Sequence, residues 1–154
     1  MTRFALLSAV LLLPIAARAD DEDARRVAQE VLDKGASLFD ARDAAALAAT
    51  YTVDAEICVV GQDQGSRSYK TQVIRGRQAI ENAYQTLFKG QQSQAKSKNH
   101  VEAAKLIRPD LLAIYGRFQP DASQEGNIPF IQVRTKDGDK WLMMSLQLFI
   151  VPEK

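Results

Sequence analysis

The chain has 154 residues, and its 20 basic and 19 acidic side chains nearly cancel, leaving a formal charge of +1. This balance argues against nucleic-acid binding, because that function needs a basic surface. One cysteine excludes an internal disulfide, and one cysteine with one histidine cannot build a histidine or thiolate metal site. The acidic residues lack calcium-loop spacing and no phosphate-loop motif is present, so we expect no metal and no other cofactor.

Residues 1–19 have the pattern of a signal peptide, with Arg3, a short apolar run and the small residues of "ARA" ending at Ala19. We expect cleavage after Ala19 and export to the periplasm or the medium. The apolar run is short for a bilayer and is followed by Pro14, which disfavours a retained membrane anchor. Cleavage leaves residues 20–154, one domain with 18 basic and 19 acidic residues and a formal charge of about −1.

The mature chain begins with helical patterns. Acidic residues 20–23 suit a helix start, and apolar side chains recur at helical spacing as far as Phe39. Asp43 can cap a second, short helix over residues 44–51. The run 55–60, "AEICVV", is typical of a buried strand, and residues 69–76 alternate as its hairpin partner.

A third helix over residues 80–88 has the clearest period, and Gly90 lies where a C-terminal cap is expected. Turn-forming sequences at 108–110, 120–127 and 136–139 then separate four strand-like runs, which predicts an antiparallel meander. This order predicts an α+β fold. Three helices would pack on one face of a curved, cone-shaped antiparallel sheet of about six strands and enclose a conical space.

Three segments, "FDARDAAALAATYTVDAEICVVG", "IRGRQAIENAYQTLF" and "RTKDGDKWLMMSLQLF", resemble the signature regions of the nuclear transport factor 2-like superfamily, in particular its SnoaL-like group. The resemblance covers nearly the whole mature chain. It implies a conical pocket whose use differs among members, from proton-transfer isomerases, cyclases and dehydratases to domains that only assemble. We therefore expect an exported domain that binds a small, largely apolar molecule, with proton-transfer chemistry as an extension. The alternative is a non-catalytic dimerisation or protein-interaction module of the same fold.

Two residues are candidates for proton transfer, Asp54 at the junction of helix and strand and His100 at a strand start. Each also has a simpler explanation, because Asp54 can bond local backbone and His100 can be an exposed strand end. A nucleophilic pair of Cys58 and His100 is disfavoured, since Cys58 lies within an apolar strand where a small hydrophobe is usual.

Candidate ligand contacts come from strand alternation. Tyr115 and Arg117 share one face of their strand, and "AIYGRF" resembles the strand of the calmodulin-dependent kinase association domain whose arginine enters the central pocket. The resemblance implies that Arg117 meets an anionic ligand group, while an exposed arginine on the outer face is the alternative.

The last strand supplies the other candidates. Strict alternation places Trp141, Ser145 and Gln147 on one face, which we expect to line an otherwise apolar pocket together with Tyr84 and Tyr51. The alternative is that Ser145 and Gln147 are satisfied polar groups at a subunit interface. The expected partners are thus a small apolar or weakly anionic molecule and a second copy of the chain in a homodimer, with no membrane contact after cleavage.

Overall fold

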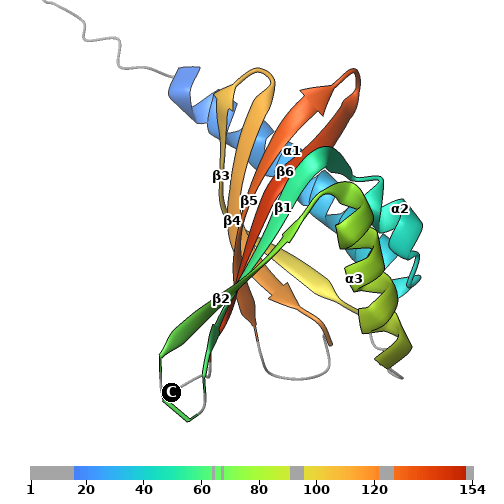
Figure 1. Ribbon diagram of the computed structural model, residues 1–154. Helices are drawn as coiled ribbons and strands as arrows, with labels where there is room; N and C mark the ends of the chain where they lie inside the picture. Colours follow the sequence, from blue (N-terminus) through green and yellow to red (C-terminus); the bar gives the residue numbers. More distant parts are fainter. Residues whose placement is uncertain (1–15, 64, 67, 91–95, 122–126, 152–154) are drawn as a thin grey trace, which may run out of the picture.

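A computed structural model describes residues 16–63, 65–66, 68–90, 96–121 and 127–151, with side chains described from residue 22 onward (Figure 1). The predicted leader, residues 1–19, therefore lies mostly outside the described residues. The helices are α1 (Ala16–Asp40), α2 (Ala44–Ala48) and α3 (Arg77–Gly90). The strands are β1 (Tyr51–Gln62), β2 (Tyr69–Arg75), β3 (Lys98–Arg108), β4 (Leu111–Gln119), β5 (Ile128–Asp137) and β6 (Lys140–Ile150). Among the described residues, none of the helices is long and apolar enough to cross a membrane.

The six strands form one curved, unclosed sheet in the order β2-β1-β6-β5-β4-β3. The meander of β3 to β6 is antiparallel throughout, as the three turn sequences predicted. β1 instead pairs with β6 in parallel, because α3 and four strands, β2 to β5, separate the two in the chain and return β6 in the same direction. The last strand therefore lies inside the sheet, which explains why its sequence is apolar on both faces.

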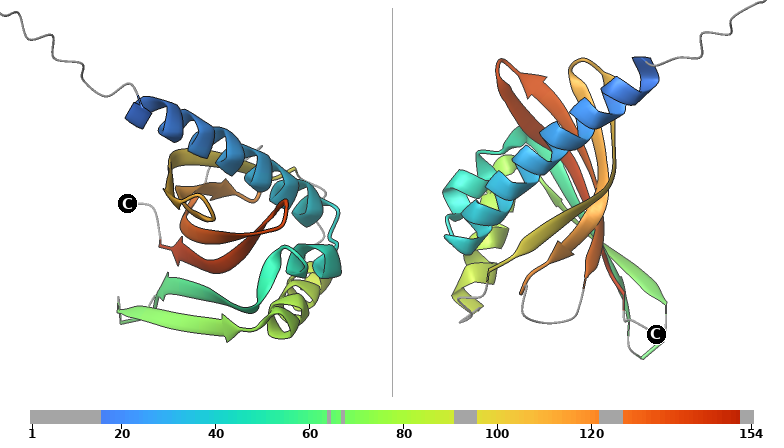
Figure 2. Two further views of the ribbon diagram at one scale, coloured as in Figure 1. Left: turned by 90° about the horizontal axis from the view of Figure 1, so that it is seen from above. Right: turned by 180° about the vertical axis from the view of Figure 1, so that it is seen from behind.

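The three helices lie on the concave side of the sheet, where α1 crosses β3 and β4, and α3 packs on α2 and β1 (Figure 2). The core between them is built from side chains that are almost fully buried, among them Leu32, Ile80, Leu112, Ile114 and Phe130. The predicted α+β class and the packing of three helices on a curved sheet are confirmed.

Two glycines occupy positions that disfavour a side chain, Gly116 for lack of space and Gly76 because of its positive φ. Gly116 lies where β4 passes β3, and a Cβ added there would overlap the carbonyl oxygen of His100 and lie 2.7 Å from Cζ of Phe130. Gly76 has φ of 84° in the tight turn between β2 and α3, and its amide donates to the carbonyl of Ala55 at 2.8 Å. These contacts fix the outer strands and α3 against the sheet.

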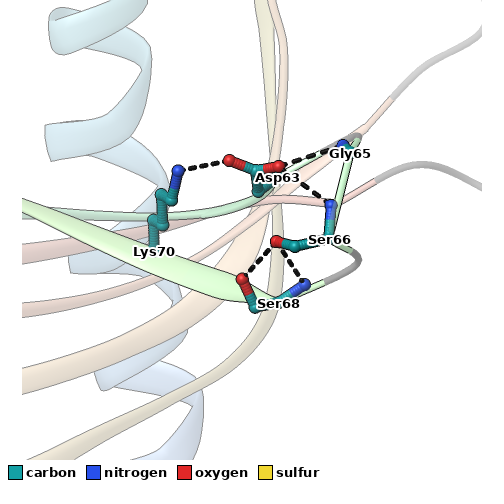
Figure 3. Close-up of polar contacts among 5 residues, drawn as sticks. All are labelled: Asp63, Gly65, Ser66, Ser68 and Lys70. Atoms are coloured by element: carbon teal, nitrogen blue, oxygen red, sulfur yellow. Dashed lines mark hydrogen bonds and ion pairs between the residues drawn. The ribbon is translucent and has the colours of Figure 1, made fainter.

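The β1–β2 hairpin ends in a turn organised by Asp63 (Figure 3). Its Oδ1 accepts hydrogen bonds from the amides of Gly65 at 2.9 Å and Ser66 at 3.1 Å, and its Oδ2 pairs with Lys70 across the hairpin. The bond from Lys70 and those two amides lower the pKa of Asp63 below its usual range. The hairpin extends beyond the helices, away from the core (Figure 1).

A β-bulge at Met144 shifts the face pattern of β6. Val133 pairs with Ser145 but the next residue, Arg134, pairs with Met143, so β6 contains one residue more than β5 at this point. Met143 and Leu146 are consequently both buried, although three positions separate them. After the bulge each residue of β6 therefore lies on the face opposite to the one that strict alternation predicts.

Candidate functional site

The concave face and the helices enclose a cavity of about 260 Å³. Its walls come from the three helices, from Tyr51 of β1 and from the inner faces of β3 to β6. Most of the lining is apolar and includes Leu32, Phe39, Leu47, Phe118, Ile128, Phe130, Met143, Leu146, Leu148 and Ile150. The polar lining residues are Thr50, Tyr51, Tyr84, Asn99, Gln132 and Arg134. An apolar hollow with a few convergent polar groups is the usual form of a small-molecule site.

Arg134 is the main charged feature of this cavity. Its side chain enters from β5 and is only 3 % exposed, and Gln132, two positions earlier on the same strand face, is 6 % exposed. Nε of Arg134 donates to Oε1 of Gln132 at 3.0 Å, and a terminal nitrogen lies 3.4 Å from the carbonyl oxygen of Trp141. In the described part of the chain, no carboxylate lies within ion-pair distance of Arg134. A buried cation without a counter-ion is costly, and an anionic ligand group would offset that cost.

Burial changes the acid–base behaviour of the polar end. Desolvation lowers the pKa of Arg134 to about 10, while the nearby hydroxyls of Tyr51 and Tyr84 oppose this change. The guanidinium therefore still carries its charge at neutral pH. Desolvation raises the pKa of both tyrosines, so their hydroxyls stay protonated and can donate hydrogen bonds.

The hydroxyls of Tyr51 and Tyr84 lie 2.7 Å apart, from β1 and α3 respectively. One hydroxyl must donate to the other, so one proton of the pair is left to bond another acceptor in the cavity. Arg77, at the start of α3, fixes the backbone of Tyr51 by donating to its carbonyl oxygen from Nε at 3.0 Å and Nη2 at 2.6 Å. The hydroxyl pair is thus held by both the sheet and the helix.

The cavity has a polar end and an apolar end. Tyr51, Met143 and Arg134 form one row across β1, β6 and β5. From Arg134 the lining of β5 runs through Gln132 and Phe130 to Ile128, a distance of about 20 Å for an extended strand. At that far end Leu87 is 40 % exposed and Ile150 is 51 % exposed. The geometry therefore places the charge deep inside and the apolar mouth toward solvent.

Some predicted ligand contacts lie in this cavity and others do not. Tyr51 and Tyr84 line it, as expected from the sequence. Ser145 and Gln147 were expected there, but the bulge at Met144 turns them to the opposite, convex face of the sheet. Trp141 does not line the cavity either, and lies in a neighbouring groove, where its carbonyl oxygen contacts Arg134.

For β4 the structure shows the alternative given above, an exposed arginine on the outer face, and not an inward-facing Arg117. Leu112, Ile114 and Gly116 form the strand's buried face, so Tyr115 and Arg117 lie on the convex face, and Arg117 pairs with Glu102 at 3.1 Å. The buried side of this strand is the apolar one, because the helices cover that side.

The two candidate acid–base residues lie outside the cavity. Asp54 and His100 are exposed, and neither is among the lining residues. Their catalytic role is untested, but the expected position inside the cone was the reason for predicting it. Within the described residues, no three His, Cys, Asp or Glu side chains gather in a way that could hold a metal ion.

Sequence reasoning missed the two residues that define the polar end. In "IPFIQVRTKD" the polar Gln132 and Arg134 point into the protein, while Ile131 on the other face is 39 % exposed. A strand with polar residues inside and apolar residues outside reverses the usual pattern. The alternation was visible in the sequence, but its direction relative to the helices was not.

The fold was compared with those of known proteins. No family model matches the sequence, and no curated protein matches it. Among solved structures, an NTF-2 like protein of unknown function from Shewanella oneidensis has a TM-score of 0.59 at 13% identity, covering 78% of this chain and 93% of that chain. An ntf2-like protein with a cystatin-like fold from Novosphingobium aromaticivorans has a TM-score of 0.53 at 16% identity, with 88% and 87% covered.

A putative calcium/calmodulin dependent protein kinase II association domain from Xanthomonas campestris is also similar, with a TM-score of 0.57 at 17% identity over 100% of both chains. Identities this low show shared architecture rather than shared activity. The chain therefore has the nuclear transport factor 2-like fold, as its three sequence segments predicted.

Proposed function

We propose that this protein binds a small, largely apolar molecule that carries one anionic group. The observation that supports the proposal is the buried guanidinium of Arg134 at the polar end of an apolar cavity, with no carboxylate partner in the described part of the chain. The ligand would place its anionic group against Arg134 and its apolar part along Phe130 and Leu148 toward the mouth. Hydrogen bonds between a cation and an anion are strong in such a desolvated setting.

The proposal is one of binding and does not include proton transfer. Among the described lining residues there is no Asp, Glu or His to act as a base near neutral pH. The raised pKa of Tyr51 and of Tyr84 keeps both hydroxyls protonated, so the one proton not used in their mutual hydrogen bond can be donated to a ligand oxygen. A carboxylate is the simplest group that accepts from both a guanidinium and a phenol.

Protein purified without denaturation from the organism that makes it tests this proposal. Extracted ligands would be identified by mass spectrometry and compared between the wild type and Arg134→Met. We expect an acidic, mostly apolar compound in the wild-type extract that is depleted in the variant. Equal retention by both proteins would contradict the proposal.

A second candidate function, homodimer assembly, is favoured by the convex face of the sheet. Ladder pairing places Cys58, Gln147, Ile131 and Tyr115 in one row across β1, β6, β5 and β4. Of these, Ile131 is 39 % exposed and Tyr115 is 43 % exposed, and no helix covers this face in the described chain (Figure 2). A second copy would bury the row against itself.

Light scattering during size-exclusion chromatography tests the dimer. We expect a dimer for the wild type and for Ile107→Asp, which changes an exposed isoleucine of edge strand β3, and a monomer for Ile131→Asp. A monomeric wild type would exclude this second candidate.

Export remains a proposal that rests on the pattern of residues 1–19 alone.

A further inference from the structure

A second hollow lies beside the cavity. It is a groove of about 560 Å³ between α1 and the hairpin of β5 and β6. Arg134 and Thr50 line both the groove and the cavity, so the two hollows border each other at the polar end of the cavity. Apolar side chains that include Val31, Leu38 and Trp141 line part of the groove.

The groove carries an excess of positive charge. Its lining has the basic residues Lys34, Arg134, Lys136 and Lys140 and the acidic residues Glu30 and Asp139. Glu30 already pairs with Arg26 at 3.0 Å. Within the described ranges none of the three lysines has a carboxylate at ion-pair distance, and all three are exposed. A chain with a formal charge of only +1 therefore gathers unpaired ammonium groups in one place.

We infer that this groove is the head-group subsite for the cavity's ligand, which is an anionic amphiphile with more than one negative charge. The inference rests on the proposed function of the cavity. The apolar chain occupies the cavity, the first anionic group contacts Arg134 where the hollows border each other, and the remaining head contacts Lys34, Lys136 and Lys140. The ligand class is an acyl chain joined to a polyanionic head.

Two features favour one continuous ligand over separate ones. The described lining of the cavity supplies a single cation, so a second negative charge there would be desolvated without a partner. The groove supplies three exposed cations directly beyond that point, and lysine ammonium groups act as point charges that tolerate varied head geometry. Charge complementarity thus assigns the chain to one hollow and the head to the other.

Two probes that share a ten-carbon chain test this inference. Decanoate has one carboxylate, whereas N-decanoyl-glutamate has a head with two carboxylates. Dissociation constants would be measured by calorimetry, and the fluorescence of Trp141, the single tryptophan of the chain, would report occupancy of the groove. The groove variant is Lys34→Gln/Lys136→Gln/Lys140→Gln. The control variant, Lys89→Gln/Lys98→Gln/Lys105→Gln, removes the same charge from exposed positions outside both hollows.

We expect the wild type and the control variant to bind N-decanoyl-glutamate about tenfold more tightly than decanoate, with a change in Trp141 fluorescence. The ratio should fall to about one in the groove variant. A ratio near one in the wild type, or a ratio that survives in the groove variant, overturns the head-group subsite while decanoate binding leaves the cavity proposal in place. If decanoate does not bind at all, the cavity proposal itself fails, and this inference with it.

Discussion

Nε of Arg134 donates a hydrogen bond to Oε1 of Gln132 at 3.0 Å, and both side chains are buried in the wall of the same cavity. This bond and the weaker contact with the carbonyl oxygen of Trp141 leave other guanidinium N–H groups for a ligand. Gln132 therefore orients Arg134 without neutralising its charge.

Arg134 should be dispensable for folding. Arg134→Met removes a buried charge that has no carboxylate partner in the described chain, and methionine can fill the apolar space. Relief of the buried charge offsets the hydrogen bond that Gln132 loses, so we expect the free energy of unfolding in urea to stay within about 1 kcal/mol of the wild type. Phe130→Ala, at a neighbouring buried position, should lose about 3 to 5 kcal/mol in the same assay. A comparable loss in Arg134→Met would make this residue structural.

Ligand binding should depend on the charge of Arg134. The pKa of Arg134 is lowered to about 10 by burial, and an anion binds the protonated form, so affinity is lost as pH rises through that value. We expect the dissociation constant of decanoate not to change from about pH 7 to 9. Above about pH 10 it should rise by up to about tenfold per pH unit. Circular dichroism at each pH would confirm that the protein remains folded. A midpoint near neutrality would indicate a different binding group.

Most of the fold could be predicted from the sequence because each element carries its own local signal. The period of α3, the three turn sequences and the apolar run of β6 are all visible without knowledge of distant contacts. β1 is longer than the predicted strand at residues 55–60, since pairing with β6 extends regular structure back to Tyr51. The strand propensities of residues 51–54 are a local property and do not predict a pairing with a strand about 90 residues away.

The site was less predictable for two physical reasons. The bulge at Met144 depends on how β6 pairs with β5, and it reverses the faces of Ser145 and Gln147. The placement of Arg134 depends on which side of β5 the helices cover, and the alternation of β5 does not by itself identify that side. The positions of Tyr51 and Tyr84 could be predicted from local sequence. Tyr51 lies at the boundary between the second helix and the first strand, and Tyr84 belongs to the apolar period of α3.

Gly116 should not tolerate a side chain. In Gly116→Ala the new methyl group would overlap the backbone of His100 and crowd the ring of Phe130, so the strands or the core must move. We expect a loss of at least about 1 to 3 kcal/mol in the free energy of unfolding. Gly35→Ala is the matched control, because it lies within α1 with nothing near the new Cβ, and it should gain up to about 1 kcal/mol. Equal effects of the two substitutions would contradict the close packing of β3 and β4.

The hydroxyls of Tyr51 and Tyr84 should act as a coupled pair. Removing either one as Tyr51→Phe or Tyr84→Phe leaves the other buried without this partner, whereas removing both leaves neither unsatisfied. A double-mutant cycle in urea should therefore give a coupling energy of about 1 kcal/mol. Additive effects would show that each hydroxyl is satisfied independently.

The most direct test of the binding account is calorimetry of decanoate with the wild type, Arg134→Met and Arg117→Met. The two variants remove the same side chain, one from the cavity and one from the convex face, where Arg117 pairs with Glu102. We predict that Arg134→Met weakens binding at least about tenfold, as expected for a buried charge-assisted hydrogen bond, and that Arg117→Met binds like the wild type. Unchanged binding by Arg134→Met, or a loss confined to Arg117→Met, would contradict the account.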